Sequence, residues 1–219
     1  MMTTERLIEA LAADARPVAP LPPPAQRLGL WLAIGIPAMA VAVLIGRPRP
    51  DLALKVTELP WLIEQGAAFL TALLAAYAAF SLVVPGRSRQ VAWLPLAPFL
   101  IWLGTLGIGC LRSWLARESA GLAFEPELEC LPSIVAVGAV PCLAIYWMVK
   151  RCAPLRPGLT LALAALAAAA LGNVGHSMTH EQNSGLMVLV WHFGSVAALA
   201  GLGWGLGRLL LTWRTVRPA

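Results

Sequence analysis

Six long apolar runs dominate the pattern of hydrophobic and polar positions along the chain. They occupy residues 28–46, 61–84, 91–111, 131–149, 158–175 and 185–207. Each run is 18 to 24 residues long, close to the roughly 20 residues with which an α-helix crosses the hydrocarbon core of a bilayer. None of them alternates apolar with polar residues, as a strand of a membrane β-barrel would. The pattern therefore predicts an all-α polytopic membrane protein with six transmembrane helices in one bundle.

Composition agrees with a membrane protein and excludes several other classes. Of the 219 residues, 59% are hydrophobic and 12% are charged. An ordinary soluble domain has about 45–50% apolar and about 25% charged residues. The same numbers, with a mean hydropathy of +0.75, exclude a disordered chain and the usual polar, basic nucleic-acid binder. The net charge of +5 is spread over the short gaps between the runs.

The charges in these gaps predict an orientation. Six spans place both termini on one side, which carries 11 of the 16 basic residues and 3 of the 11 acidic ones. Because an excess of Lys and Arg in short loops marks the cytoplasmic side, we expect both termini in the cytoplasm. The first apolar run begins only at residue 28, behind a polar helix and a Pro-rich linker. It is expected to remain as an anchor rather than to be cleaved.

The segment before the first run is a separate polar unit. Residues 3–16 predict a short amphipathic helix, with Leu7, Ile8 and Leu11 on one face. The following "PVAPLPPPAQR" predicts a semi-rigid polyproline spacer. Because a helix of about 14 residues is marginal alone in water, its apolar face needs a surface to cover it. That surface is either the membrane and the protein's own cytoplasmic turns, or the groove of a partner protein.

Four cysteines occur, without a CxxC pair that would indicate a thiol oxidoreductase. The predicted topology places Cys110 and Cys130 near the outer face, Cys142 inside the fourth span and Cys152 at the cytoplasmic face. In an oxidising outer compartment Cys110 and Cys130 can form a bridge or bind a soft metal ion. The alternative for Cys110 is a small packed residue.

All three histidines are expected near the outer side. His176 and His180 are i, i+4 neighbours if the fifth span stays helical that far, and this spacing can hold one metal ion. With Cys130 they would form a Cys/His metal site. The pattern matches no fixed-spacing metal motif, so ordinary histidines in a solvated loop, His192 included, are the alternative interpretation.

The last run contains two offset GxxxG pairs, Gly201 with Gly205 and Gly203 with Gly207. Such pairs allow a neighbouring helix to approach closely, which predicts a compact bundle packed through small residues.

Charged residues are almost absent from the runs. Glu64, near the first edge of its run, is the only Asp, Glu, Lys or Arg in the six runs. Ion pumps and proton-coupled transporters usually carry such a residue deep in a span, so a transporter is disfavoured. The chain has no phosphate loop, HExxH motif or Ser-His-Asp arrangement, and we expect no enzyme and no resident cofactor.

A set of segments at the edges of the spans resembles a known family. In order along the chain these are "LIEALAADARPVAPL", "VPGRSRQVAWLPLAP", "GIGCLRSWL", "LECL", "APLRPGLT" and "MVLVWHFG". Together they resemble the NrsF family of bacterial inner-membrane anti-sigma factors, over essentially the whole chain.

This resemblance implies a regulator that holds an extracytoplasmic-function sigma factor through its cytoplasmic N-terminal segment. It also implies release of that factor when a stress signal, often linked to cysteine chemistry, is sensed on the outer side. Carried onto this sequence, the first sensing cysteine is Cys130. The implied docking segment consists of Leu7, Ile8, Leu11, Asp14, Pro17 and Val18.

One position departs from the family pattern. Some members carry a second outer cysteine shortly before a segment like 184–191, where this chain has His180. A histidine there permits soft-metal ligation with Cys130 but forbids a disulfide, and a pair of Cys110 with Cys130 stays open.

The sequence therefore predicts an anti-sigma factor with three parts. Residues 1–27 form the docking segment and linker, residues 28–210 the six-helix bundle, and residues 211–219 a cytoplasmic tail. The expected partners are a sigma factor and the lipid bilayer, without direct contact to nucleic acid. The alternatives are a small-molecule or metal-ion permease and a non-catalytic structural membrane subunit.

Overall fold

The computed structural model describes residues 3–14, 20–115, 130–152, 154–179 and 194–211, with the backbone alone at 110, 112–114 and 130–135. This part of the chain is all-α and contains no strand, as predicted. Its helices, in order, are α1 (Thr4–Ala13), α2 (Pro24–Gly46), α3 (Leu52–Lys55), α4 (Leu59–Leu82), the 3₁₀ helix η1 (Arg89–Trp93), α5 (Leu96–Leu115), α7 (Cys130–Lys150), α8 (Pro157–Ser177) and α10 (Gly194–Leu210).

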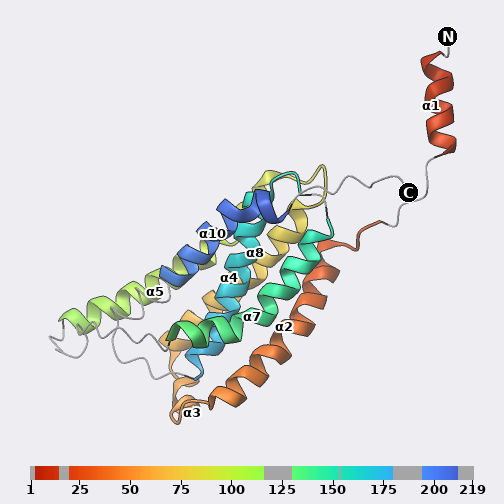
Figure 1. Ribbon diagram of the computed structural model, residues 1–219. Coiled ribbons are helices and arrows are strands. Elements are labelled where there is room, and N and C mark those ends of the chain that lie inside the picture. Colours follow the sequence, from red (N-terminus) through yellow and green to blue (C-terminus); the bar gives the residue numbers. More distant parts are fainter. Residues whose placement is uncertain (1–2, 15–19, 116–129, 153, 180–193, 212–219) are drawn as a thin grey trace.

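Six apolar helices, α2, α4, α5, α7, α8 and α10, form one elongated bundle (Figure 1). Four segments are long and apolar enough to cross a membrane: α2, α4, η1 with most of α5, and α8. The described apolar portions of the other two, Ala136–Lys150 and Gly194–Leu210, are shorter.

Helix α8 is the centre of the bundle, where it packs against α4, α7, α10 and α2, while α5 packs against α4. Contacts between helix termini define how the helices run. Arg27, in the first turn of α2, binds carbonyls near the ends of α4 and α7. The backbone N–H of Arg49, just after α2, donates to the carbonyl of Met178, just after α8. Successive helices are therefore antiparallel, and we call the two ends of the bundle the Arg27 end and the Arg49 end.

The bundle is packed with small residues inside and large ones outside. The facing surfaces of α4 and α8 are built largely from buried alanines: Ala68, Ala72, Ala75, Ala76, Ala79, Ala164, Ala167, Ala168 and Ala170. Large apolar side chains instead cover the outside of the peripheral helices: Leu30, Ile34, Val41, Leu44, Ile45, Leu100, Ile101, Ile108, Leu202 and Leu209. In water such a surface would be unfavourable, whereas lipid tails solvate it.

Only one of the two predicted GxxxG pairs packs a helix. A Cβ atom on Gly207 would lie 2.5 Å from the Cα of Gly158, and one on Gly203 would lie 2.8 Å from the carbonyl oxygen of Leu161. A Cβ on Gly201 or Gly205 would meet nothing within 4 Å. Gly203 and Gly207 therefore let α10 cross the first turns of α8 at backbone contact.

Helix boundaries differ from the apolar runs where prolines intervene. The run 91–111 begins in η1, and α5 itself starts only at Leu96 and continues to Leu115. Pro95 precedes this start and its carbonyl accepts the N–H of Phe99, because proline lacks the N–H needed inside a helix but suits the first turn. For the same reason α2 begins at Pro24, so the predicted linker 17–27 ends in helix.

Candidate functional site

Helix α1 is a short, fully exposed amphipathic helix. Thr3 caps it by accepting the backbone N–H of Arg6 at 3.5 Å, and Glu5 lies in the first turn beside the positive end of the helix dipole. Its final turn closes when the N–H of Asp14 donates to the carbonyl of Ala10 at 3.2 Å. The helix has 10 residues, four fewer than the predicted 3–16, and none of its residues is buried.

The predicted docking residues lie together on this helix. Leu7, Ile8 and Leu11 project from one face and are 45%, 60% and 63% exposed. Asp14 follows the helix as its C-cap. Pro17 and Val18 lie outside the described residues. A helix with an uncovered apolar stripe is the form in which many peptides enter a partner's groove.

The Arg27 end of the bundle is held by a buried arginine. The guanidinium of Arg27 donates to the carbonyls of Met148 at 2.8 Å and Phe80 at 3.4 Å, and lies 4.6 Å above the centre of the Phe80 ring. Arg27 as a whole is only 5% exposed. Because guanidinium has five donors in a planar fork, one side chain joins three helices, α2, α4 and α7, where the chain from α1 enters the bundle.

The thiol of Cys152 completes this contact. Nη2 of Arg27 donates to Sγ at 3.2 Å, and the thiol donates to the carbonyl of Met148, also at 3.2 Å. Burial raises the pKa of the Cys152 thiol, and the charge and hydrogen bond of Arg27 offset part of this rise. The group is therefore a neutral thiol at pH 7, packed against a permanent cation.

The Arg49 end carries a second polar cluster, between α4 and α8. The Ser177 hydroxyl lies 2.8 Å from the Oε1 oxygen of Gln65. Asn173 and His176 are each 1% exposed and lie one turn or less away along α8. Among the described atoms, the side-chain amide of Asn173 has no hydrogen-bond partner.

An ion pair closes the loop beside this cluster. The buried guanidinium of Arg49 binds both carboxylate oxygens of Asp51, with Nε 2.5 Å from Oδ1 and Nη2 2.8 Å from Oδ2. This hydrogen bonding lowers the pKa of the Asp51 carboxyl below its ordinary value. Arg49 also anchors the loop to α8 through its backbone bond to Met178.

Comparison with known families agrees with the motifs at the span edges. Residues 11–213 match the model of the family described as NrsF, negative regulator of sigma F. The chain is a member of the NrsF family. It is also similar to the anti-sigma-F factor NrsF of Caulobacter vibrioides, with 28% identity over 221 positions that cover 97% of this chain and all of that protein. No solved structure matches.

The NrsF family model covers most of the chain, from within α1 through the whole described bundle. The family's description, negative regulator of sigma F, is that of a regulatory protein, and the match supports no catalytic activity. Leu7 and Ile8 precede the matched region, while Leu11 and Asp14 lie inside it.

The structure describes only part of the predicted metal-binding and sensing residues. Helix α8 ends at Ser177, one residue after His176, with Met178 as its C-cap, whereas the i, i+4 spacing was predicted for a helix that continues to residue 180. His176 is buried in the bundle rather than placed in a solvated loop. His180 lies outside the described residues, as do the side chains of Cys110 and Cys130. Among the described side chains, no group of three or more metal-binding residues occurs.

Two features of this NrsF-family bundle escaped the sequence analysis. The first is Arg27, which entered the sequence argument only as one of the basic residues that predict the orientation. A lone arginine between "PPPAQ" and an apolar run is also a candidate for a buried anchor. The pairing of Gln65 with Ser177 joins residues 112 positions apart. Their polarity inside or beside apolar runs was the available signal, but no pattern along the chain gives the distance between two helices.

Proposed function

We propose that this chain is a membrane-bound anti-sigma factor that sequesters an extracytoplasmic-function sigma factor through α1. A stress signal on the outer side of the membrane, redox or heavy metal in kind, would cause release. The observation that carries the proposal is the uncovered apolar face of Leu7, Ile8 and Leu11, presented outside the bundle by a chain of the NrsF family. The relative in Caulobacter vibrioides is named an anti-sigma-F factor.

Two features support six membrane spans. Small side chains fill the interior of the bundle while large apolar ones cover its outside, and the two ends differ in charge. The described Arg27 end carries basic side chains and no carboxylate: Arg27, Arg87, Arg89, Lys150, Arg151, Arg156 and Arg208. The carboxylates of the described bundle lie at or near the Arg49 end: Asp51, Glu58 and Glu64. An excess of Lys and Arg marks the cytoplasmic side, and fewer of these residues, Arg47, Arg49 and Lys55, lie at the Arg49 end, so we assign the Arg27 end, α1 and both termini to the cytoplasm.

Binding would place α1 in a hydrophobic groove of the sigma factor. Fully burying each of the three large side chains contributes roughly 1.5–3 kcal/mol, reduced by the entropy lost when the linker and side chains become ordered. The polar face, with Arg6 and Glu9, would stay at the rim of the interface. This geometry requires no change in the bundle for capture, only access to α1.

Sensing belongs to the opposite end in this proposal. Helix α5 runs away from the Arg27 end and contains Cys110, and α7 starts at Cys130 and returns toward Arg27. A soft metal ion bound by Cys130 and His180, or oxidation of Cys110 with Cys130, would act on the starts and ends of these helices. His176, being buried, would join a metal site only after a local rearrangement.

Co-purification tests the docking step. Tagged full-length protein from native membranes is compared with the double variant Leu7→Asp/Leu11→Asp and with a matched control, Arg6→Gln/Glu9→Gln. We expect a sigma factor to accompany the wild type and the control, and to be lost with the apolar-face variant. Deletion of residues 1–16 is expected to abolish capture while the bundle still inserts in the membrane. Retention of the sigma factor by either the deletion or the apolar-face variant would contradict docking through α1.

Accessibility labelling tests the orientation. A single cysteine introduced at Arg87, in the turn after α4, is expected to resist a membrane-impermeant maleimide in intact cells. One introduced at Glu58, between α3 and α4, is expected to react. The reverse labelling pattern would place α1 outside the cytoplasm and would exclude capture of a sigma factor.

A further inference from the structure

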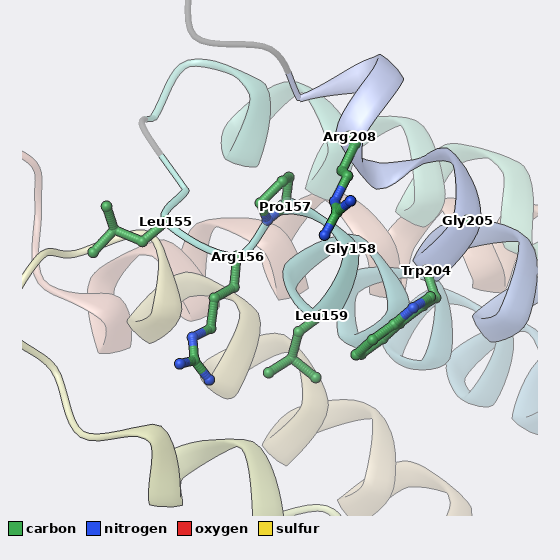
Figure 2. Close-up of a pocket in the computed structure, with 8 residues that line it drawn as sticks. All are labelled: Leu155, Arg156, Pro157, Gly158, Leu159, Trp204, Gly205 and Arg208. Atoms are coloured by element: carbon green, nitrogen blue, oxygen red, sulfur yellow. The ribbon is translucent and has the colours of Figure 1, made fainter.

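An open pocket of about 540 Å³ lies at the Arg27 end, between the start of α8 and the last turns of α10. Arg156 and Arg208 line it together with Trp204, Leu155 and Leu159. Figure 2 shows Arg208 and Trp204 reaching from α10 toward the first turn of α8, with Leu159 projecting from α8 and Arg156 from the position just before it, its guanidinium well apart from that of Arg208. Two cations therefore flank a cavity that also has an apolar wall.

Nothing within the described bundle neutralises these two cations. No ion pair or hydrogen bond joins the side chain of Arg156 or Arg208 to another described residue. Described carboxylates of the bundle lie near the other end, so the described lining of the pocket carries net positive charge. An anion is the complementary ligand, because guanidinium groups recognise phosphate through charge and paired N–H donors.

The backbone adds further donors at the same place. The N-cap of α8 is Arg156, whose side chain has no acceptor and makes no capping bond. The N–H of Thr160 donates to the carbonyl of Arg156, so the first turn, at the positive end of the helix dipole, is formed by Gly158 and Leu159. Both residues line the pocket. This uncapped helix start strengthens a site that the two arginines already define.

We infer that this pocket binds the phosphate headgroup of an anionic phospholipid from the cytoplasmic leaflet. The inference rests on the membrane placement of the bundle proposed above, and is independent of capture of a sigma factor. A lipid fits better than free phosphate because Leu155 and Trp204 are exposed, at 62% and 60%, beside the cations. An indole belongs at the headgroup level of a bilayer, and basic pockets between helices on the cytoplasmic side are suited to anionic headgroups.

Such a lipid would bridge α8 and α10 where Gly158 and Gly207 already bring their backbones together. It would occupy the same end of the bundle as Arg27, from which the chain leads to α1. The headgroup would thus be a component of the cytoplasmic surface that faces a captured partner.

Native mass spectrometry of the full-length protein in detergent measures this binding. Phosphatidylglycerol is titrated against phosphatidylcholine with the same acyl chains. We expect the first phosphatidylglycerol to bind about tenfold or more tightly than phosphatidylcholine, and Arg156→Gln/Arg208→Gln to remove that preference. The single variant Arg208→Gln, at an exposed position, is expected to reduce the preference severalfold and covers the case that the double variant does not fold.

The matched control removes the same charge from the same end, as Arg87→Gln/Arg89→Gln, and is expected to keep the preference. Equal loss in the control would overturn the site, because general surface charge would then explain binding. A calorimetric titration with inorganic phosphate separates the two sources of the anion. Phosphate binding that depends on Arg156 and Arg208, without any preference for phosphatidylglycerol, would overturn the lipid assignment. Loss of sigma-factor capture alone has no bearing on these outcomes.

Discussion

Arg27 and Cys152 lie 3.2 Å apart, from guanidinium nitrogen to thiol sulfur, although 125 positions separate them in the sequence. This contact lies where the linker from α1 enters the bundle and where α7 ends. The same guanidinium binds Met148 and Phe80, so the entry point of the N-terminal segment is tied to two further helices. Any movement of α7 relative to α4 would therefore change the contacts of Arg27 in the first turn of α2, where the chain from α1 enters the bundle.

Replacing Arg27 tests its role as a structural anchor. Arg27→Met keeps most of the volume but removes every donor and leaves the carbonyls of Met148 and Phe80 without this partner. We expect a loss of about 1.5–3 kcal/mol in the free energy of unfolding, measured by thermal or denaturant unfolding in detergent. For Arg27→Lys we expect a free energy of unfolding between those of the wild type and Arg27→Met, since an ammonium cannot reach all the acceptors. The control Arg87→Met, at an exposed turn, should be close to wild type, and an equal loss there would contradict the anchor.

The reactivity of Cys152 tests the environment of its thiol. In a background with Cys110, Cys130 and Cys142 changed to Ser, we expect maleimide labelling to reach half its maximal rate above the pH found for a free cysteine, about 8.5. Burial raises the thiol pKa, so the reactive thiolate forms only at higher pH. Arg27→Met should shift this midpoint further upward, because it removes a cation that lowers the pKa. A midpoint at or below that of free cysteine would refute the buried thiol.

The two glycine pairs of α10 give opposite expectations. Gly207→Ala places a Cβ against the backbone of Pro157 and Gly158, at 2.5 Å, and neither can give way. We expect it to destabilise the α8–α10 contact by about 1–3 kcal/mol, which thermal unfolding in detergent would measure. Gly205→Ala meets nothing within 4 Å and should be neutral or slightly stabilising. If both variants behaved alike, the assignment of the packed face would be wrong.

A double-mutant cycle tests the polar contact between α4 and α8. The variants are Gln65→Leu, Ser177→Ala and their combination, with unfolding in detergent as the measurement. We expect a coupling energy of about 0.5–1.5 kcal/mol, since the 2.8 Å hydrogen bond is buried. A cycle of Gln65→Leu with Thr105→Val should give none, because Thr105 bonds only within α5, to Trp102. Zero coupling in the first cycle would show that the two side chains act independently.

The sequence alone was sufficient to predict the helices, the family and the apolar face of α1. Runs of about 20 apolar residues leave the backbone no alternative to helices, because in lipid every N–H and carbonyl must be paired within the segment. The family followed from segments at the span edges and is confirmed by the match over residues 11–213. The amphipathic face of α1 was also readable, because helical periodicity alone places Leu7, Ile8 and Leu11 together.

Tertiary structure decided which residues meet. The periodicity of α10 made the pairs 201/205 and 203/207 equally suitable, and only the position of α8 selected Gly203 and Gly207. Likewise, a lone arginine before an apolar run is ambiguous between a headgroup charge and a buried anchor. Three acceptors, one in α4, one in α7 and one just after α7, made Arg27 a buried anchor. The physical reason is the same in both cases: a local pattern specifies a helix and its faces, whereas the partner of each face depends on distances between segments far apart in the chain.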